Sequence, residues 1–110
     1  MTNIARYTSV LRRIRDYLVR FGDQHWVPLL NEWLAELSGD ISAAYLREHA
    51  CRSMKVTSGM GSLGDLSIYP GNGHKISNDR AEISRASKGL WDMTEELYEA
   101  AKAIVDEIGS

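Results

Sequence analysis

A glycine-rich segment in the middle of the chain carries the residues whose types and spacing come closest to a chemical motif. It reads Gly59-Met60-Gly61-Ser62-Leu63-Gly64-Asp65-Leu66. Its glycines follow the G-x-G-x-x-G spacing that lays a pyrophosphate on a helix N-terminus, a mechanism that needs a strand before the glycines and a helix after them. Here helical periodicity precedes the glycines, and the residues after them run into Pro70. A dinucleotide site is therefore not expected.

Two interpretations of the glycine-rich segment remain open. In the first it is a tight structural turn, in which Ser62 caps backbone N–H groups and Asp65 acts as a box-like partner. In the second it is a loop that presents Ser62, Asp65 and free backbone amides to a ligand or partner. With His74 the loop holds the residue types of a nucleophilic catalyst, but it lacks the G-x-S-x-G spacing of a hydrolase. A small-molecule or anion site built from Ser62, Asp65 and His74, with or without catalysis, is the second function that the sequence supports.

A second set of candidate residues lies near the end of the chain, where carboxylates dominate. From residue 92 to residue 107, six carboxylates stand against Lys102, a net charge of −5. The candidates for contact with a partner are Glu95, Glu96 and Glu99. On the exposed face of a helix such carboxylates form an ordinary solvated surface rather than an acid–base pair. Because acidic surfaces steer basic partners and raise association rates, this composition favours binding to a basic protein.

Four stretches of the chain have the apolar spacing of three and four residues that is typical of amphipathic helices. They are residues 3–20, 24–37, 41–51 and 79–108. The sequence therefore predicts an all-α fold, an antiparallel four-helix bundle formed by a single helical domain over residues 1–110. The crossover between the third and fourth helices is long and glycine-rich.

The crossover is also expected to hold a short β-hairpin. Residues 66–69 form its first strand, the Pro-Gly-Asn-Gly sequence at 70–73 its turn, and residues 74–76 its second strand. An isolated hairpin is marginally stable in water, so this one must pack on the helices. Its expected anchors are Leu63, Leu66, Ile68 and Ile76.

The two terminal helices are expected to be neighbours because their charges are opposite. The first carries five arginines against Asp16, a net charge of +4, whereas the last is acidic. The last helix would be about 45 Å long, and a globule of this size has a diameter of about 34 Å. Either Gly89 kinks this helix, or its first turns project and cover the glycine-rich segment.

Composition argues against several classes of function. The net charge of −2 disfavours general nucleic-acid binding, which depends on phosphate neutralisation. Nucleic-acid binding through the arginine-rich first helix is a third function hypothesis, and it predicts that the affinity falls steeply with salt. A single cysteine, Cys51, fits a reducing compartment, here the cytoplasm. No apolar run approaches the about 20 residues of a membrane span. Because the histidines and Cys51 are scattered singly, neither a metal nor a cofactor is expected.

The residues around the glycine-rich segment carry a resemblance. Trp26 and Trp33 lie on the second predicted helix, upstream of this segment, and Asn72-Gly73-His74 follows it. On these residues the chain resembles a family of small uncharacterised bacterial proteins, a domain of unknown function, that share a G-M-G-S-L-x-D-L segment after a Trp-containing helix. The resemblance covers roughly residues 24–78. It implies a single-domain cytoplasmic protein without an established activity, and some members are similar in size and style to toxin-neutralising immunity proteins.

The leading hypothesis is therefore a non-enzymatic binding protein, an immunity or inhibitor protein for a cognate basic toxin. It rests on the acidic last helix beside a shaped loop and on the lack of a complete catalytic set of residues. The expected partner is a protein. No membrane contact is expected, and a homo-oligomer is left open.

Overall fold

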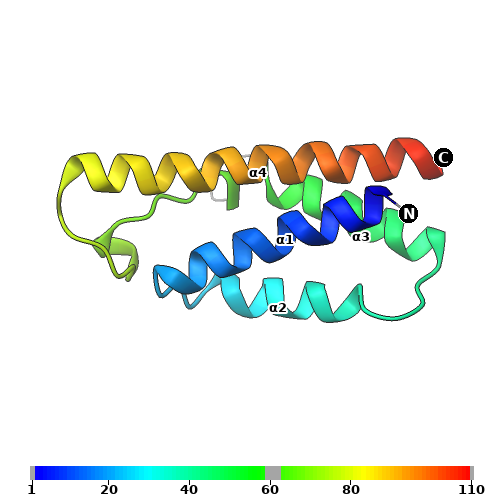
Figure 1. Cartoon of the computed structure of the whole chain (residues 1–110), viewed down its shortest axis with the longest axis horizontal. Helices are drawn as coiled ribbons and strands as arrows, with labels where there is room; N and C mark the ends of the chain where they lie inside the picture. Colours follow the sequence, from blue (N-terminus) through cyan, green and yellow to red (C-terminus); the bar gives the residue numbers. More distant parts are fainter. Residues whose placement is uncertain (1, 59–62, 110) are drawn as a thin grey trace.

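The computed structural model describes residues 2–58 and 63–109, and in these ranges it consists of helices and connecting turns (Figure 1). The elements in chain order are α1 (Thr2–Arg20), α2 (Trp26–Glu36), α3 (Ala43–Val56), the 3₁₀ turns η1 (Leu63–Asp65) and η2 (Pro70–Asn72), and α4 (Arg80–Ile108). The prediction of an all-helical chain with four α-helices is confirmed. None of the helices in these ranges is both long and apolar enough to cross a membrane.

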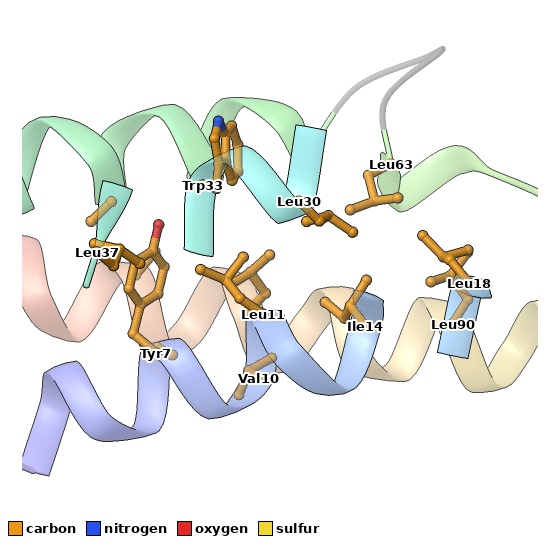
Figure 2. Packing of buried hydrophobic residues seen from close by; sticks show 14 of the residues in the cluster. Tyr7, Val10, Leu11, Ile14, Leu18, Leu30, Trp33, Leu37, Leu63 and Leu90 are labelled. Atoms are coloured by element: carbon orange, nitrogen blue, oxygen red, sulfur yellow. The ribbon is translucent and has the colours of Figure 1, made fainter. Parts of the chain in front are cut away.

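One hydrophobic core is shared by all four helices and by η1. On α1 the predicted stripe is buried, including Leu11, Ile14 and Leu18. Figure 2 shows Leu11 and Ile14 on the side of α1 that faces Leu30 of α2, with Leu18 near Leu63. α4 packs against α1 and α3, and α1 packs against α2. The expectation that the two terminal helices are neighbours is therefore confirmed.

α4 runs along the whole long axis of the molecule, which measures 45 × 22 × 22 Å (Figure 1). The helix continues through Gly89 without interruption. The predicted overrun assumed a round body, whereas the molecule is elongated and as long as the helix. Gly89 has a different role, because a Cβ at this position would lie 2.5 Å from the Tyr17 hydroxyl oxygen. The absent side chain lets Tyr17 approach α4 and donate a hydrogen bond to the Ala86 carbonyl oxygen at 2.8 Å.

The third helix is longer than predicted and begins later. Ser42 is its N-cap and accepts a hydrogen bond from the Tyr45 amide at 3.1 Å, so the expected start at residue 41 is wrong. The expected end at Cys51 is also wrong, because Ser53 and Met54 continue the face that packs on the core. The helix ends only at Val56.

The predicted β-hairpin is wrong, since the described part of the crossover contains no strand. The reason is that helix side chains bond its backbone. The Ile68 amide donates to Ser87 Oγ at 2.9 Å, and Trp91 Nε1 donates to the Leu66 carbonyl oxygen at 2.8 Å. The predicted anchors are confirmed: Leu63 and Ile68 are buried, and the other two pack against the core.

Candidate functional site

A cleft of about 530 Å³ lies where the end of α3, η1 and α4 meet. It will be called the acidic cleft, and its lining residues are Thr57, Gly64, Trp91, Thr94, Glu95, Tyr98 and Glu99. Five of these lie on α4 at intervals of three and four, so one helix face presents them together. The structure thus brings two of the predicted partner-binding residues, Glu95 and Glu99, beside the described end of the glycine-rich segment.

The two carboxylates of the acidic cleft are exposed. Among the described residues neither Glu95 nor Glu99 forms an ion pair. The charge of Glu99 also acts on Lys102, one turn further along the helix, whose pKa is raised first by its hydrogen bond to Asp106 and also by Glu99. The cleft is therefore a region of negative potential with two carboxylates available to a cation.

Aromatic side chains complete the wall of the acidic cleft. Trp91 is 42% exposed although it is large and apolar. Its indole N–H donates to the Leu66 carbonyl oxygen, which fixes the ring against the crossover. Tyr98 lies half-buried in the same wall. A fixed, exposed aromatic face beside carboxylates can bind a guanidinium or ammonium group.

Glu96 and Asp65, also predicted to bind a partner, do not line the cleft. Glu96 lies on the side of α4 that faces α1, where its carboxylate is 3.2 Å from the Arg13 guanidinium, with both side chains half-exposed. Asp65 is exposed on η1, directly after Gly64. Ser62 and the rest of residues 59–62 lie outside the described part of the chain. The choice between a capping turn and a ligand loop at Ser62 therefore stays a prediction.

His74 is placed away from the acidic cleft, in a buried pair with Asp23. Its Nε2 lies 3.0 Å from Asp23 Oδ1, and the two side chains are 0% and 4% exposed. Its Nδ1 accepts a hydrogen bond from the Tyr69 amide at 3.3 Å, so Nε2 carries the proton that is donated to Asp23. Both ring nitrogens are engaged, which leaves none to act as a base on a substrate.

The Asp23–His74 pair fastens the crossover to the turn between α1 and α2. The other oxygen of Asp23 accepts hydrogen bonds from the Trp26 and Val27 amides, the first two of α2, at 2.6 and 3.3 Å. A backbone hydrogen bond from Lys75 to the Phe21 carbonyl oxygen, at 2.7 Å, lies beside the pair. These contacts give His74 a structural role in this region.

A second buried polar cluster joins Tyr7 to His49 and Ser53 in the core. The Tyr7 hydroxyl lies 2.7 Å from His49 Nδ1 and is also hydrogen-bonded to Ser53 Oγ. All three residues are fully buried. Burial raises the pKa of Tyr7 and lowers the pKa of His49, to which the nearby Arg52 charge also contributes. Other residues line the two clefts given for the described part of the chain, and burial of these three residues keeps them from solvent.

Sequence reasoning missed the Tyr7–His49–Ser53 cluster. The available signal was on the third helix, where His49 and Ser53 are four residues apart on the same face as Ala50 and Leu46. A polar pair on an apolar face must find a partner from another element. That partner is Tyr7 of α1, whose ring is buried in the core while its hydroxyl reaches His49.

Comparison with protein-family models, with curated proteins and with solved structures gave no match. Among the described residues, no group of three or more His, Cys, Asp or Glu side chains could hold a metal ion. The fold and the site together define an all-helical protein with an acidic, aromatic-walled cleft on its longest helix.

Proposed function

We propose that this chain is a non-enzymatic binding protein whose acidic cleft receives a basic side chain of a protein partner. The observation that carries the proposal is the pair Glu95 and Glu99, which stand without ion-pair partners among the described residues, in one cleft with Trp91 and Tyr98. The cleft volume of about 530 Å³ suits a side chain or a short segment rather than a flat protein surface.

The chemistry of the lining favours arginine or lysine as the bound group. Charge-assisted hydrogen bonds from a guanidinium to carboxylates are about twice as strong as neutral ones. A cation over the face of a tryptophan adds about 0.5–2 kcal/mol, depending on how far it is desolvated. Trp91 is held in place by its bond to Leu66 before any partner arrives, which reduces the ordering cost of binding.

The charge of α4 extends the same preference beyond the cleft. Its second half carries a net charge of −5, and such a surface steers positively charged proteins toward it. A cognate basic toxin, neutralised in the cytoplasm by this chain as an immunity protein, is the partner that fits.

The proposal treats the four helices as an antiparallel bundle with a glycine-rich crossover. The packing of α4 against α1 and α3, and of α1 against α2, supports this arrangement. On this view the crossover brings Gly64 to the wall of the cleft. The alternative, a small-molecule or anion site on Ser62, Asp65 and His74, has less support, because His74 is bonded to Asp23 and the cleft beside Gly64 is acidic.

The test compares three tagged proteins as baits in an extract of the native cell. They are the wild type, the cleft variant Glu95→Gln/Glu99→Gln, and the control variant Glu32→Gln/Glu48→Gln. The control removes two exposed carboxylates on α2 and α3 and changes the net charge equally. The wild type and the control are expected to enrich the same basic protein, whose Kd weakens at least about tenfold for the cleft variant.

Two results would overturn the proposed function. One is a partner whose enrichment is the same for the cleft variant and the wild type, because binding would then not use the acidic cleft. The other is turnover of a metabolite by the pure protein without any protein partner, because the chain would then be an enzyme.

A further inference from the structure

A second cleft lies beside the first turns of α4, and its lining is basic. It has a volume of about 500 Å³ and lies among the last turn of α1, the end of the crossover and the first turns of α4. It will be called the basic cleft; its lining includes Arg20, Lys75 and Arg85, with Tyr17, Phe21 and Ser77. None of these residues lines the acidic cleft. Ligand binding in the basic cleft therefore does not depend on the proposed function of the acidic cleft.

We infer that the basic cleft binds a small phosphate monoester whose organic part is a flat ring. Its three cations come from three different elements and are exposed. Among the described residues none of the three forms an ion pair. The single carboxylate of the lining, Glu82, already accepts a hydrogen bond from the Ser77 hydroxyl. The net charge of the lining is +2, which matches a phosphate dianion.

Two of the three cations are held in place by contacts with neighbouring residues. The Arg20 guanidinium lies over the Phe21 ring, 5.3 Å from its centroid. The aliphatic chain of Lys75 crosses Gly22 so closely that a Cβ on Gly22 would be 3.0 Å from three of its carbons. Gly22 also has a positive φ of 70°, which favours glycine. The bond of the Lys75 amide to the Phe21 carbonyl oxygen keeps the base of this side chain fixed.

The remaining wall explains the preference for a ring. Tyr17 and Phe21 are half-buried aromatic residues that meet edge-on, with centroids 5.1 Å apart. The Tyr17 hydroxyl donates to the Ala86 carbonyl oxygen, which fixes its ring in the lining of the cleft. Ile76 adds an apolar contact. Cationic groups that are pre-positioned around aromatic and apolar surface suit a phosphate attached to a flat apolar body.

The size of the basic cleft argues for a small molecule. A volume of about 500 Å³ is in the usual range for a metabolite site, about 300–1,000 Å³. A nucleic acid would instead need cations along an extended surface to neutralise successive phosphates. The three cations here converge on one cleft.

The test measures binding by isothermal titration calorimetry, with phenyl phosphate as the probe and inorganic phosphate and phenol as its two halves. The full-length wild type is compared with Arg85→Gln, with Arg20→Gln/Lys75→Gln/Arg85→Gln, and with the control Arg6→Gln/Arg12→Gln. The control removes two exposed arginines of α1 that do not line the cleft. Thermal unfolding of each free variant checks the fold, and Arg85→Gln changes only an exposed side chain.

The expected result is saturable binding of phenyl phosphate that is tighter than that of either half. Arg85→Gln should weaken it at least about tenfold, which is the loss of one charged hydrogen-bonding group. The triple variant should abolish binding, and the control should bind as the wild type does.

Three results would overturn the inference. Equal affinity for inorganic phosphate and phenyl phosphate would remove the role of the aromatic wall. Binding that survives in the folded triple variant, or a wild type without saturable binding at millimolar probe, would remove the site. Tighter binding of a ten-residue oligothymidine, lost in Arg6→Gln/Arg12→Gln, would assign the cations to a nucleic-acid surface instead.

Discussion

The two buried histidines of this molecule differ in how many of their ring nitrogens have partners. His74 has both engaged, one with Asp23 and one with the Tyr69 amide. His49 has Nδ1 beside the Tyr7 hydroxyl, while its Nε2 lies 3.4 Å from a Glu36 oxygen and makes no hydrogen bond among the described residues. Both side chains are 0% exposed.

The difference separates two uses of a buried polar side chain. In a fully bonded histidine the hydrogen bonds offset the free-energy cost of removing the ring from water. Such a residue can also link segments that are far apart in the chain, as His74 links the crossover to the turn before α2. A partly bonded one keeps part of the desolvation cost inside the core. The His74 region should therefore be sensitive to loss of its partner, and the His49 region should be sensitive to acid.

The largest expected effect follows from removing the partner of His74. Asp23→Ala takes away the buried acceptor of His74 and the carboxylate that accepts from the first two amides of α2, so the free energy of unfolding should fall by about 3 kcal/mol. Urea denaturation measures it. The matched control is Asp40→Ala, an exposed aspartate before α3, with an expected change within about 0.5 kcal/mol. Equal losses in the two variants would contradict a specific role for the pair.

A smaller loss is expected from the other cluster. Tyr7→Phe deletes the hydroxyl that serves both His49 and Ser53, leaving two buried polar groups without it. The free energy of unfolding should fall by about 2 kcal/mol. Tyr45→Phe, on a half-buried residue of α3, is the control and should change it by less than about 0.5 kcal/mol. A Tyr7→Phe variant as stable as the wild type would show that the cluster contributes no net stability.

Acid should weaken the fold through His49. Burial and the Arg52 charge lower the pKa of His49, so the unfolded chain binds its proton more readily than the folded chain does. Above the unfolded pKa of about 6.5 this difference has no effect. As pH falls through 6.5, stability should drop by at most about 1.4 kcal/mol per pH unit, until the lowered folded pKa is reached.

The acid effect is measured by urea denaturation at a series of pH values between 7.5 and 5. His49→Gln should flatten the decline, whereas the exposed His25→Gln should leave it as in the wild type. If His49→Gln loses stability in acid as steeply as the wild type, His49 is not the group responsible.

The smallest effect concerns the carboxylate beside His49. Glu36 acts to raise the pKa of His49 and is 3.3 Å from the Arg52 guanidinium. Glu36→Gln should therefore lower the pKa of His49 further. The free energy of unfolding should change by only about 0.3 kcal/mol. A histidine NMR titration measures the pKa, and Glu32→Gln on the same helix is the control. A rise in the pKa of His49 would reverse the assigned sign.

The helices could be predicted from the sequence because their signal is local. The stripe from Tyr7 to Leu18 and the repeat from Leu90 to Ile104 follow the helical period, and both are buried. The hairpin failed because its backbone groups bond Ser87 and Trp91, which lie far along the chain on α4. Turn residues at 70–73 signal a turn, but they do not determine what bonds the flanking amides.

In the candidate site, too, contacts within one helix could be predicted, whereas contacts between residues far apart in the chain could not. Glu95 and Glu99 could be placed together because four residues on a helix fix their spacing. His74 could not be assigned, because its partner Asp23 is 51 residues away in the chain. Tyr7 was also out of reach, since it meets His49 across 42 residues. The basic cleft draws its cations from three elements, so only the packed fold brings them together.

The position of α4 in the chain has a consequence for biosynthesis. This helix contacts α1, α3 and η1, yet it follows all of them in the sequence. While the ribosome is still adding residues before Arg80, the apolar faces of the earlier helices have no α4 to cover them. The nascent polypeptide therefore completes its core only after this last helix has emerged, and until then chaperones would meet exposed leucine and isoleucine side chains.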